Sequence, residues 1–309
     1  MKISQKISEF EIFKNKPITL MHIGSSGSDF KKWSNISRNS LLISIDANKI
    51  SGSSKTKFRK IISSNSIISD SNEMKKFYLT KDTHCSSLLE PNQDICKIWY
   101  GSHRFNLKKI LNRKTTSINS FLKKNKIKNI DWIVLDVQGK DLDIIKSLRK
   151  DVRNNISIVN IETGFYSFYK KADTINDVFK YMSNKFQFED MTFGLNYKTS
   201  SKRMSKLEKL VLFNMENPTK IYSNIIFLNK KNNSERLNLI KLIYLIESNK
   251  IFEAKNILEN CLNKYSYYET INKEINYLIK VKKFKFIFFS PFFILKKFLS
   301  FFKKKIKII

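Results

Sequence analysis

Acidic and amide side chains follow an apolar run of this sequence at the point where the run gives way to a turn. Asp136 and Gln138 lie at the end of the run within residues 130–137, and Gly139 then opens a helical pattern. A strand that ends in such a turn places polar side chains at the carboxyl end of a sheet, where open α/β sheets build their sites. Asp136 is therefore a candidate catalytic carboxylate, and the alternative is a buried structural acid that accepts N–H groups of the turn.

A loop of small residues lies far upstream of that turn. Gly24, Ser25 and Gly27 follow an apolar strand predicted at residues 18–23, and a helical spacing of apolar residues begins at Phe30. Glycine and serine let a ligand approach the backbone closely, and the first turn of a helix offers free N–H groups. The order therefore predicts a strand, a ligand-binding loop and a helix.

An acid follows the loop at an informative distance. Asp46 ends the next apolar strand, at residues 41–46, about twenty residues on, where a nucleotide-binding βαβ unit places its ribose-binding carboxylate. Asp46 could instead cap a helix. The loop lacks the third glycine of the dinucleotide fingerprint, and Gly24 and Gly27 are not spaced for the close fit that a pyrophosphate needs. A ligand with a ribose but no pyrophosphate suits the loop better, and S-adenosylmethionine is such a ligand.

Three further stretches, a third strand, a polar loop and a fifth strand, carry polar side chains that could reach the same edge. Ser69 and Asp70 end the third strand, where they would face an adenine. His84 in the loop and Glu162 at the end of the fifth strand are secondary candidates for a base that removes a hydroxyl proton. A solvated loop residue and an ordinary strand-end acid are the structural alternatives. The three predicted stretches are residues 65–70, 82–92 and 156–162.

The net charge of +31 invites a nucleic-acid or anionic-membrane interpretation. Lysine greatly outnumbers arginine, however, whereas recognition of bases and phosphates favours the bidentate guanidinium group. The charge is also spread along a chain of 309 residues that has only 7 Gly and 4 Pro, a composition typical of an AT-rich genome. We therefore expect no specific nucleic-acid partner.

Cysteine usage and hydropathy indicate a cytoplasmic protein. The three cysteines are too few and too irregularly spaced for a disulfide framework, and no Cys/His pair has zinc spacing, so no metal is expected. Residues 1–16 lack the apolar core of a signal peptide. No apolar run reaches the roughly 18 residues of a membrane span.

Four stretches resemble the FkbM-type family of S-adenosylmethionine-dependent methyltransferases, and together they cover roughly residues 17–230. The most specific is the turn Asp-Val-Gln-Gly at residues 136–139, which is similar to the family's "iDflKiDvqG" run and follows a matching helix start at residues 116–122. The other three stretches are residues 22–27, 83–92 and 161–165.

The sequence departs from the family pattern at several site positions. His22 and Val134 stand where the family often has Asp and Lys, and Ser26 stands where it has an acid or Asn. Asp46 and Asp141 keep a carboxylate where the family usually has Glu. These differences are also compatible with a member of the family that keeps the fold but has lost catalytic activity.

The resemblance implies a Rossmann-like class I methyltransferase sheet with helices on both faces and S-adenosylmethionine as the cofactor. It implies O-methylation of a hydroxyl of a sugar or cell-surface glycan precursor. The alternative is a non-catalytic, membrane-associated binding module that keeps the fold. The candidate catalytic residues are Asp136, Gln138, His84 and Glu162, and the candidate cofactor-binding residues are Gly24, Ser25, Gly27, Asp46, Ser69, Asp70 and Asp136.

We predict an N-terminal arm at residues 1–16, a methyltransferase domain at 17–230, a tetratricopeptide-like helical hairpin at 231–282 and a basic Phe/Lys-rich tail at 283–309. One hairpin cannot bury its own apolar face, so it should dock on the domain or on a partner. The tail suits an interfacial membrane segment at the anionic inner face of the membrane, and packing on the domain is the alternative. Within the domain, helices are also predicted at 54–62 and 174–186, and strands at 188–193, 210–213 and 225–228.

Overall fold

The computed structural model describes residues 2–26, 28–48, 56–199 and 204–286. It contains two compact units. The larger is Ser8–Ile240, and the smaller combines Met1–Ile7 with the chain from Lys241 onward.

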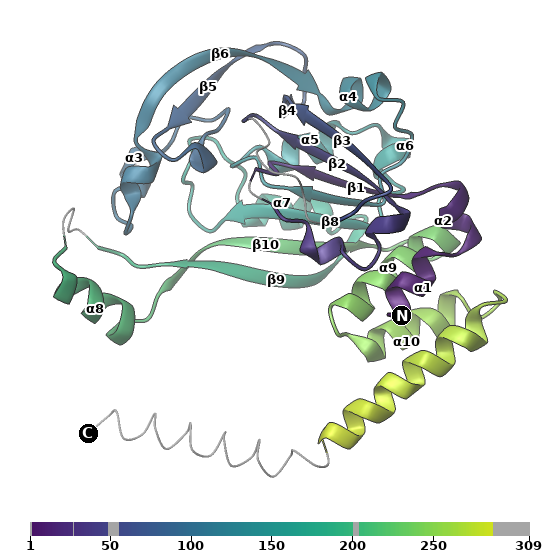
Figure 1. Ribbon diagram of the computed structural model, residues 1–309. Helices are drawn as coiled ribbons and strands as arrows, with labels where there is room; N and C mark the ends of the chain where they lie inside the picture. Colours follow the sequence, from purple (N-terminus) through teal and green to yellow (C-terminus); the bar gives the residue numbers. More distant parts are fainter. Residues whose placement is uncertain (1, 27, 49–55, 200–203, 287–309) are drawn as a thin grey trace, which may run out of the picture. The chain divides into compact units, whose positions relative to one another are not determined.

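A twisted sheet organises the larger unit (Figure 1). Within the described residues, its strands lie in the order β3-β2-β1-β7-β8-β10-β9. The first five in this order run parallel, and β10 runs antiparallel to both of its neighbours. This arrangement confirms the predicted Rossmann-like α/β fold. The strands are β1 Ile18–Ile23, β2 Ser40–Asp46, β3 Lys60–Asn65, β7 Trp132–Leu135, β8 Ile158–Gly164, β9 Phe186–Asn196 and β10 Thr219–Asn229.

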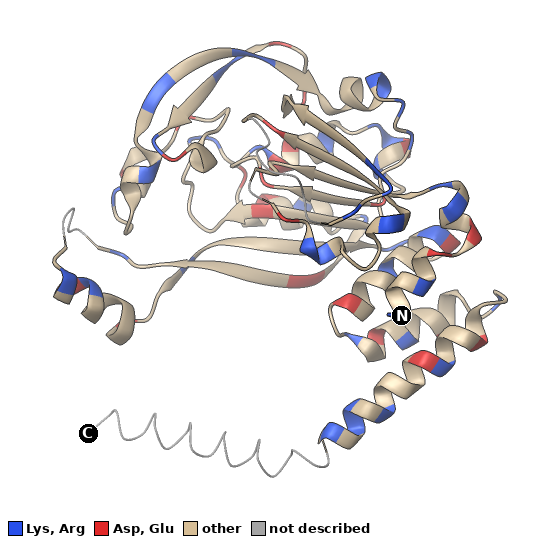
Figure 2. Ribbon diagram, viewed as in Figure 1, with Lys and Arg blue, Asp and Glu red and all other residues tan. Residues whose placement is uncertain are grey.

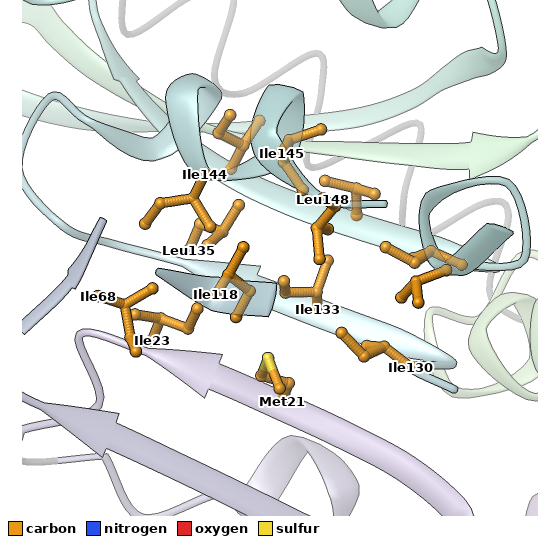
Figure 3. Close-up of a cluster of buried hydrophobic side chains, with 14 of the residues drawn as sticks. Met21, Ile23, Ile68, Ile118, Ile130, Ile133, Leu135, Ile144, Ile145 and Leu148 are labelled. Carbon is orange, nitrogen blue, oxygen red and sulfur yellow. The ribbon is translucent and has the colours of Figure 1, made fainter. Parts of the chain in front are cut away.

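The centre of the sheet is the pair β1 and β7, and every residue of both strands is buried. Such strands are apolar without alternation because both faces of a parallel sheet are covered. Figure 3 shows Met21 of β1 and Ile133 of β7 among the side chains of the core. The helices that contribute to the same core include α4 Ile118–Lys124, α5 Asp141–Ser147 and α7 Ile175–Met182.

A smaller sheet consists of β4 Ile67–Ser69, β5 Met74–Thr80 and β6 Leu107–Ser117, with β6 between the other two. Our third strand, residues 65–70, is therefore largely β4 of this small sheet. The strand that follows β2 in the main sheet is β3, where we predicted a helix at 54–62. Ile61 and Ile62 have helical spacing with Phe58, but they pair with Leu42 and Ile43 of β2, and pairing along an open sheet edge overrides weak local propensity.

Two other local predictions are wrong. A pair of 3₁₀ turns, Lys31–Trp33 and Ser37–Asn39, replaces the helix expected after the small-residue loop, because β2 already begins at Ser40. Residues 210–213 belong to helix α8, Lys206–Met215, rather than to a strand. A four-residue apolar run fits either state, and here the capping box of Ser205 and Glu208 starts a helix. The remaining short helices are α2 Glu11–Asn15, α3 Gln93–Cys96 and α6 Lys150–Arg153.

The smaller unit is helical. It contains α1 Ile3–Ser8, most of α9 Glu235–Glu247, α10 Ile251–Cys261 and helical residues 268–286. Ser4 donates a hydrogen bond to Glu247, and Lys6 pairs with Glu274, so α1 contacts the C-terminal helices. Ile271 and Ile275 are buried, so the helical segment at residues 268–286 also has an apolar side that is covered.

The predicted tail, residues 283–309, lies outside the described residues from 287 onward, and its membrane role stays a prediction. In the described part of the chain, no helix has both the length and the apolar character needed to cross a membrane.

Candidate active site

A cavity of about 330 Å³ opens at the carboxyl ends of β1, β2, β7 and β8. Gly24 and Asp136 directly follow β1 and β7, Asp46 ends β2, and Glu162 lies two residues before the end of β8; all four line the cavity. The order of the strands in the sheet places β1 and β2 on one side of Asp136 and β8, β10 and β9 on the other. The parallel sheet thus brings together residues that are more than a hundred positions apart in the sequence.

Gly24 sets the close approach of β1 and β7. Its φ is +81°, and an added Cβ would lie 1.8 Å from the carbonyl oxygen of Asp136. The Asp136 N–H donates to the carbonyl of Ile23 at 3.0 Å, so the strand pairing continues up to the site. No side chain fits between Gly24 and Asp136, which is the physical reason for glycine at this position.

Asp46 is 7% exposed and holds the loop that follows β1. Its two carboxylate oxygens accept hydrogen bonds from the Ser26 N–H at 2.9 Å and from the Asn48 N–H at 2.7 Å. Ser25 is buried, and its hydroxyl lies 2.7 Å from that of Ser44, so it supports the loop from behind and does not line the cavity. Gly27 lies outside the described residues.

Gln138 joins the carboxyl groups of Asp136 and Glu162. Its side-chain nitrogen donates to Asp136 Oδ1 at 2.7 Å and points to Glu162 Oε1 at 3.3 Å. The other oxygen of Glu162 lies 3.4 Å from the side-chain nitrogen of Asn224 on β10. The structure therefore brings together three of the four residues predicted to act in catalysis.

Several contacts fix the Gln138 side chain in this position. Its backbone has a left-handed φ of 60°, uncommon for a residue other than glycine. Ser87 donates to its carbonyl at 2.8 Å, and the Tyr169 hydroxyl lies 2.7 Å from its side-chain oxygen. The buried carboxylate of Asp141 accepts the N–H groups of Val137 and Gly139 on either side, at 2.8 and 3.1 Å.

Burial makes this group of acids hard to ionise. Desolvation, and then the charges of Asp136 and Asp141, raise the pKa of Glu162 to about 9. Desolvation also raises the pKa of Asp136, against the hydrogen bond from Gln138, and that of Asp141 to about 7. Neighbouring carboxyl groups in a site of low polarity share protons in this way. Glu162 thus holds a proton at neutral pH, and burial opposes the ionisation of Asp136 beside it.

His84 lies on an exposed turn that also lines the cavity. Asp82 fixes the turn, since its carboxylate accepts the His84 N–H at 3.1 Å and the Arg104 Nε–H at 2.7 Å. Arg104 lines the cavity as well. His84 is therefore at the mouth of the site, while Gln138 and Glu162 are deeper in the wall.

Ser69 and Asp70 do not line the cavity. The Ser69 hydroxyl donates to Asp70, whose carboxylate pairs with Lys75 at 2.6 Å. The preceding residues of the same segment, Ser66, Ile67 and Ile68, face the cavity instead.

Sequence reasoning missed the residues that complete the far wall. Tyr100, Phe105, Tyr166, Phe168 and Tyr222 line the cavity, yet they come from different loops and strands with no common spacing. Gly194 gives one of them room, because an added Cβ there would lie 2.0 Å from the ring of Tyr222. Ser87 and Tyr169 fall in or beside stretches that resemble the family, which is the one signal that could have identified them.

Comparison with known proteins agrees with this geometry. The model of the Methyltransferase FkbM domain matches residues 30–193, more than half of the chain. A search of curated proteins finds no match.

Proposed function

The chain belongs to the FkbM methyltransferase family, and from this membership we propose that it is an S-adenosylmethionine-dependent O-methyltransferase. We propose a hydroxyl of a sugar or of a cell-surface glycan precursor as the acceptor. The observation that carries the proposal is the hydrogen-bonded group Asp136, Gln138 and Glu162, which stands between two chemically different ends of one cavity.

The end of the cavity beside β1 and β2 fits the cofactor. Asp46 has both oxygens in hydrogen bonds to backbone N–H groups, and each oxygen keeps a further lone pair for a ribose hydroxyl. Gly24 leaves the backbone open on its cavity side, and Ala47, Ile67 and Ile68 provide apolar lining suited to an adenine. S-adenosylmethionine would supply an electrophilic methyl group on a sulfonium.

The carboxyl group of Asp136 is the base that we assign. Methyl transfer to oxygen requires the acceptor hydroxyl to lose its proton, and a positioned base contributes roughly 10²–10⁴-fold to such a step. Asp136 accepts the proton in its ionised form, and the proton held by Glu162 limits the negative charge beside it. Gln138 holds both groups in place, and orientation supplies much of the remaining rate.

The end of the cavity beside β8 and β10 fits the acceptor. Aromatic rings there provide flat apolar faces, which suit the C–H faces of a sugar ring, and Arg104 with His84 offers donors for its hydroxyl groups. We extend the proposal to a cytoplasmic enzyme whose tail, residues 283–309, contacts the membrane.

Calorimetric titration of the full chain with S-adenosylmethionine tests the cofactor assignment. We expect saturable binding that Asp46→Ala weakens roughly tenfold or more, because the ribose loses a charge-assisted hydrogen bond. Asp70→Ala is the matched control, since Asp70 lies away from the cavity. If the full chain does not bind the cofactor at high micromolar concentration, the enzyme proposal fails and the non-catalytic binding module takes its place.

Transfer of labelled methyl groups to a panel of sugars and lipid-linked glycan precursors tests the acceptor. Methylation of a sugar hydroxyl is the expected result. If the protein binds the cofactor and methylates only amines or proteins in cell extracts, the acceptor class is wrong even though the cofactor assignment stands.

A further inference from the structure

Helix α8 presents its apolar face to solvent. Leu207, Leu210, Val211 and Met215 follow the i, i+3, i+4, i+8 spacing that places side chains on one helical face, and they are 69%, 61%, 43% and 79% exposed. The buried residue of this helix is Leu212, on the opposite side. An amphipathic helix normally does the reverse, because burying the larger apolar face stabilises the fold more.

The position of α8 in the larger unit explains this exposure. The helix connects β9 and β10 and lies beyond the ends of both strands, away from the core of the sheet (Figure 1). A capping box of Ser205 and Glu208 starts it, and this local contact stabilises the first turn without burial of the apolar face.

Lysines accompany the apolar face. Lys206 and Lys209 lie on α8 itself, where Figure 2 shows basic residues, and the segments before and after the helix carry exposed Lys198 and Lys220. Apolar side chains flanked by lysines are the pattern of a helix that lies in the interface of an anionic lipid surface. A second copy of the chain is a poorer partner, because each copy carries the same lysines and a net charge of +31.

We propose that α8 binds an anionic lipid surface through Leu207, Leu210, Val211 and Met215. This inference does not depend on the proposed reaction or on the predicted tail. Helix α8 is also linked to the cavity. The ring centroid of Phe213 lies 5.2 Å from that of Tyr100, which lines the cavity. A helix bound at the lipid surface would hold the mouth of the cavity near that surface.

A fluorescent label on α8 gives a local test that binding by another segment cannot mimic. Leu210→Cys is labelled with bimane in a Cys261→Ser background, since Cys85 and Cys96 are buried. We expect a blue shift of the emission with vesicles of phosphatidylglycerol in phosphatidylcholine, and a smaller shift at high salt. An unchanged spectrum with these vesicles would overturn the proposal. So would a shift that appears without vesicles as protein concentration rises, because a second copy would then cover the face.

Flotation of the full chain with the same vesicles measures the energetic importance of the face. The variant Leu207→Ser, Leu210→Ser, Met215→Ser should lower the vesicle partition coefficient roughly tenfold or more. The matched control is Met74→Ser with Phe252→Ser, two apolar residues that are similarly exposed elsewhere. If both variants lose vesicle binding equally, α8 has no specific role in binding the lipid surface.

Discussion

The Tyr169 hydroxyl lies 2.7 Å from the side-chain oxygen of Gln138 and holds the amide group beside the two acids. The amide nitrogen of Gln138 points to Asp136 and Glu162, where its two hydrogens are used. Because the hydroxyl also lies 2.8 Å from the carbonyl oxygen of Cys85, Tyr169 connects the polar loop to the group of Asp136, Gln138 and Glu162.

Tyr169→Phe should therefore lower kcat/KM by roughly tenfold to a hundredfold, the effect of losing one buried hydrogen bond. The freed amide could rotate and present its oxygen to the acids, so the pH profile of kcat/KM should shift while cofactor affinity stays unchanged. Tyr181→Phe is the control, since its hydroxyl bonds to Arg153 away from the cavity. Equal effects of both substitutions would argue against an orienting role for Tyr169.

Asp136→Asn should reduce turnover by roughly 10²–10⁴-fold, because the amide keeps the shape of the side chain but cannot accept the hydroxyl proton. Cofactor affinity measured by calorimetry should change far less than turnover, whereas Asp46→Asn should chiefly weaken cofactor binding. If the turnover of Asp136→Asn is unchanged, Asp136 is not the base, and Glu162 is the next candidate for that role.

Glu162→Gln should make the protein less sensitive to alkaline pH. The pKa of Glu162 is raised in the folded state to about 9, so the folded protein retains a proton that the unfolded chain releases at the ordinary carboxyl pKa. The stabilising contribution is present at acid pH and is lost as pH rises through that range. Urea unfolding at about pH 5.5 and about pH 8.5 should show the variant gaining stability relative to the parent at the higher pH. If the difference in unfolding free energy between variant and parent is the same at both pH values, Glu162 is ionised at both of them.

Asp131→Asn should destabilise the larger unit by about 3–5 kcal/mol, because it leaves a charge without its partner. Asp131 is 3% exposed and accepts two hydrogen bonds of 2.7 Å from the guanidinium group of Arg236, as well as one from the N–H of Thr19. Asp151→Asn is the control, since the ion pair with Arg149 is exposed and should contribute less than about 1 kcal/mol. Similar midpoints in urea for both variants would contradict this prediction.

Much of the central sheet could be predicted from local pattern. The apolar runs that became β1, β2, β7 and β8 are long enough and bounded sharply enough to specify buried strands, and the acids at their ends then share one edge by the geometry of parallel sheets. Helices α4 and α7 likewise begin at side chains that cap them, Ser117 and Thr174. The predictions at residues 60–62 and 210–213 are wrong because a few apolar residues in a row fit both states, and a sheet edge or a capping box decides between them.

The sequence by itself determined the fold class, the family, and the acids Asp46, Asp136 and Glu162 as strand-end residues, because these depend on runs and spacings within short segments. Only the tertiary structure decided that Gln138 bridges two of those acids, that Tyr169 and Ser87 hold it, and that Ser69 and Asp70 lie off the cavity. Those relationships join residues from separate loops, and burial, which sets the protonation of Glu162, exists only once the chain has packed.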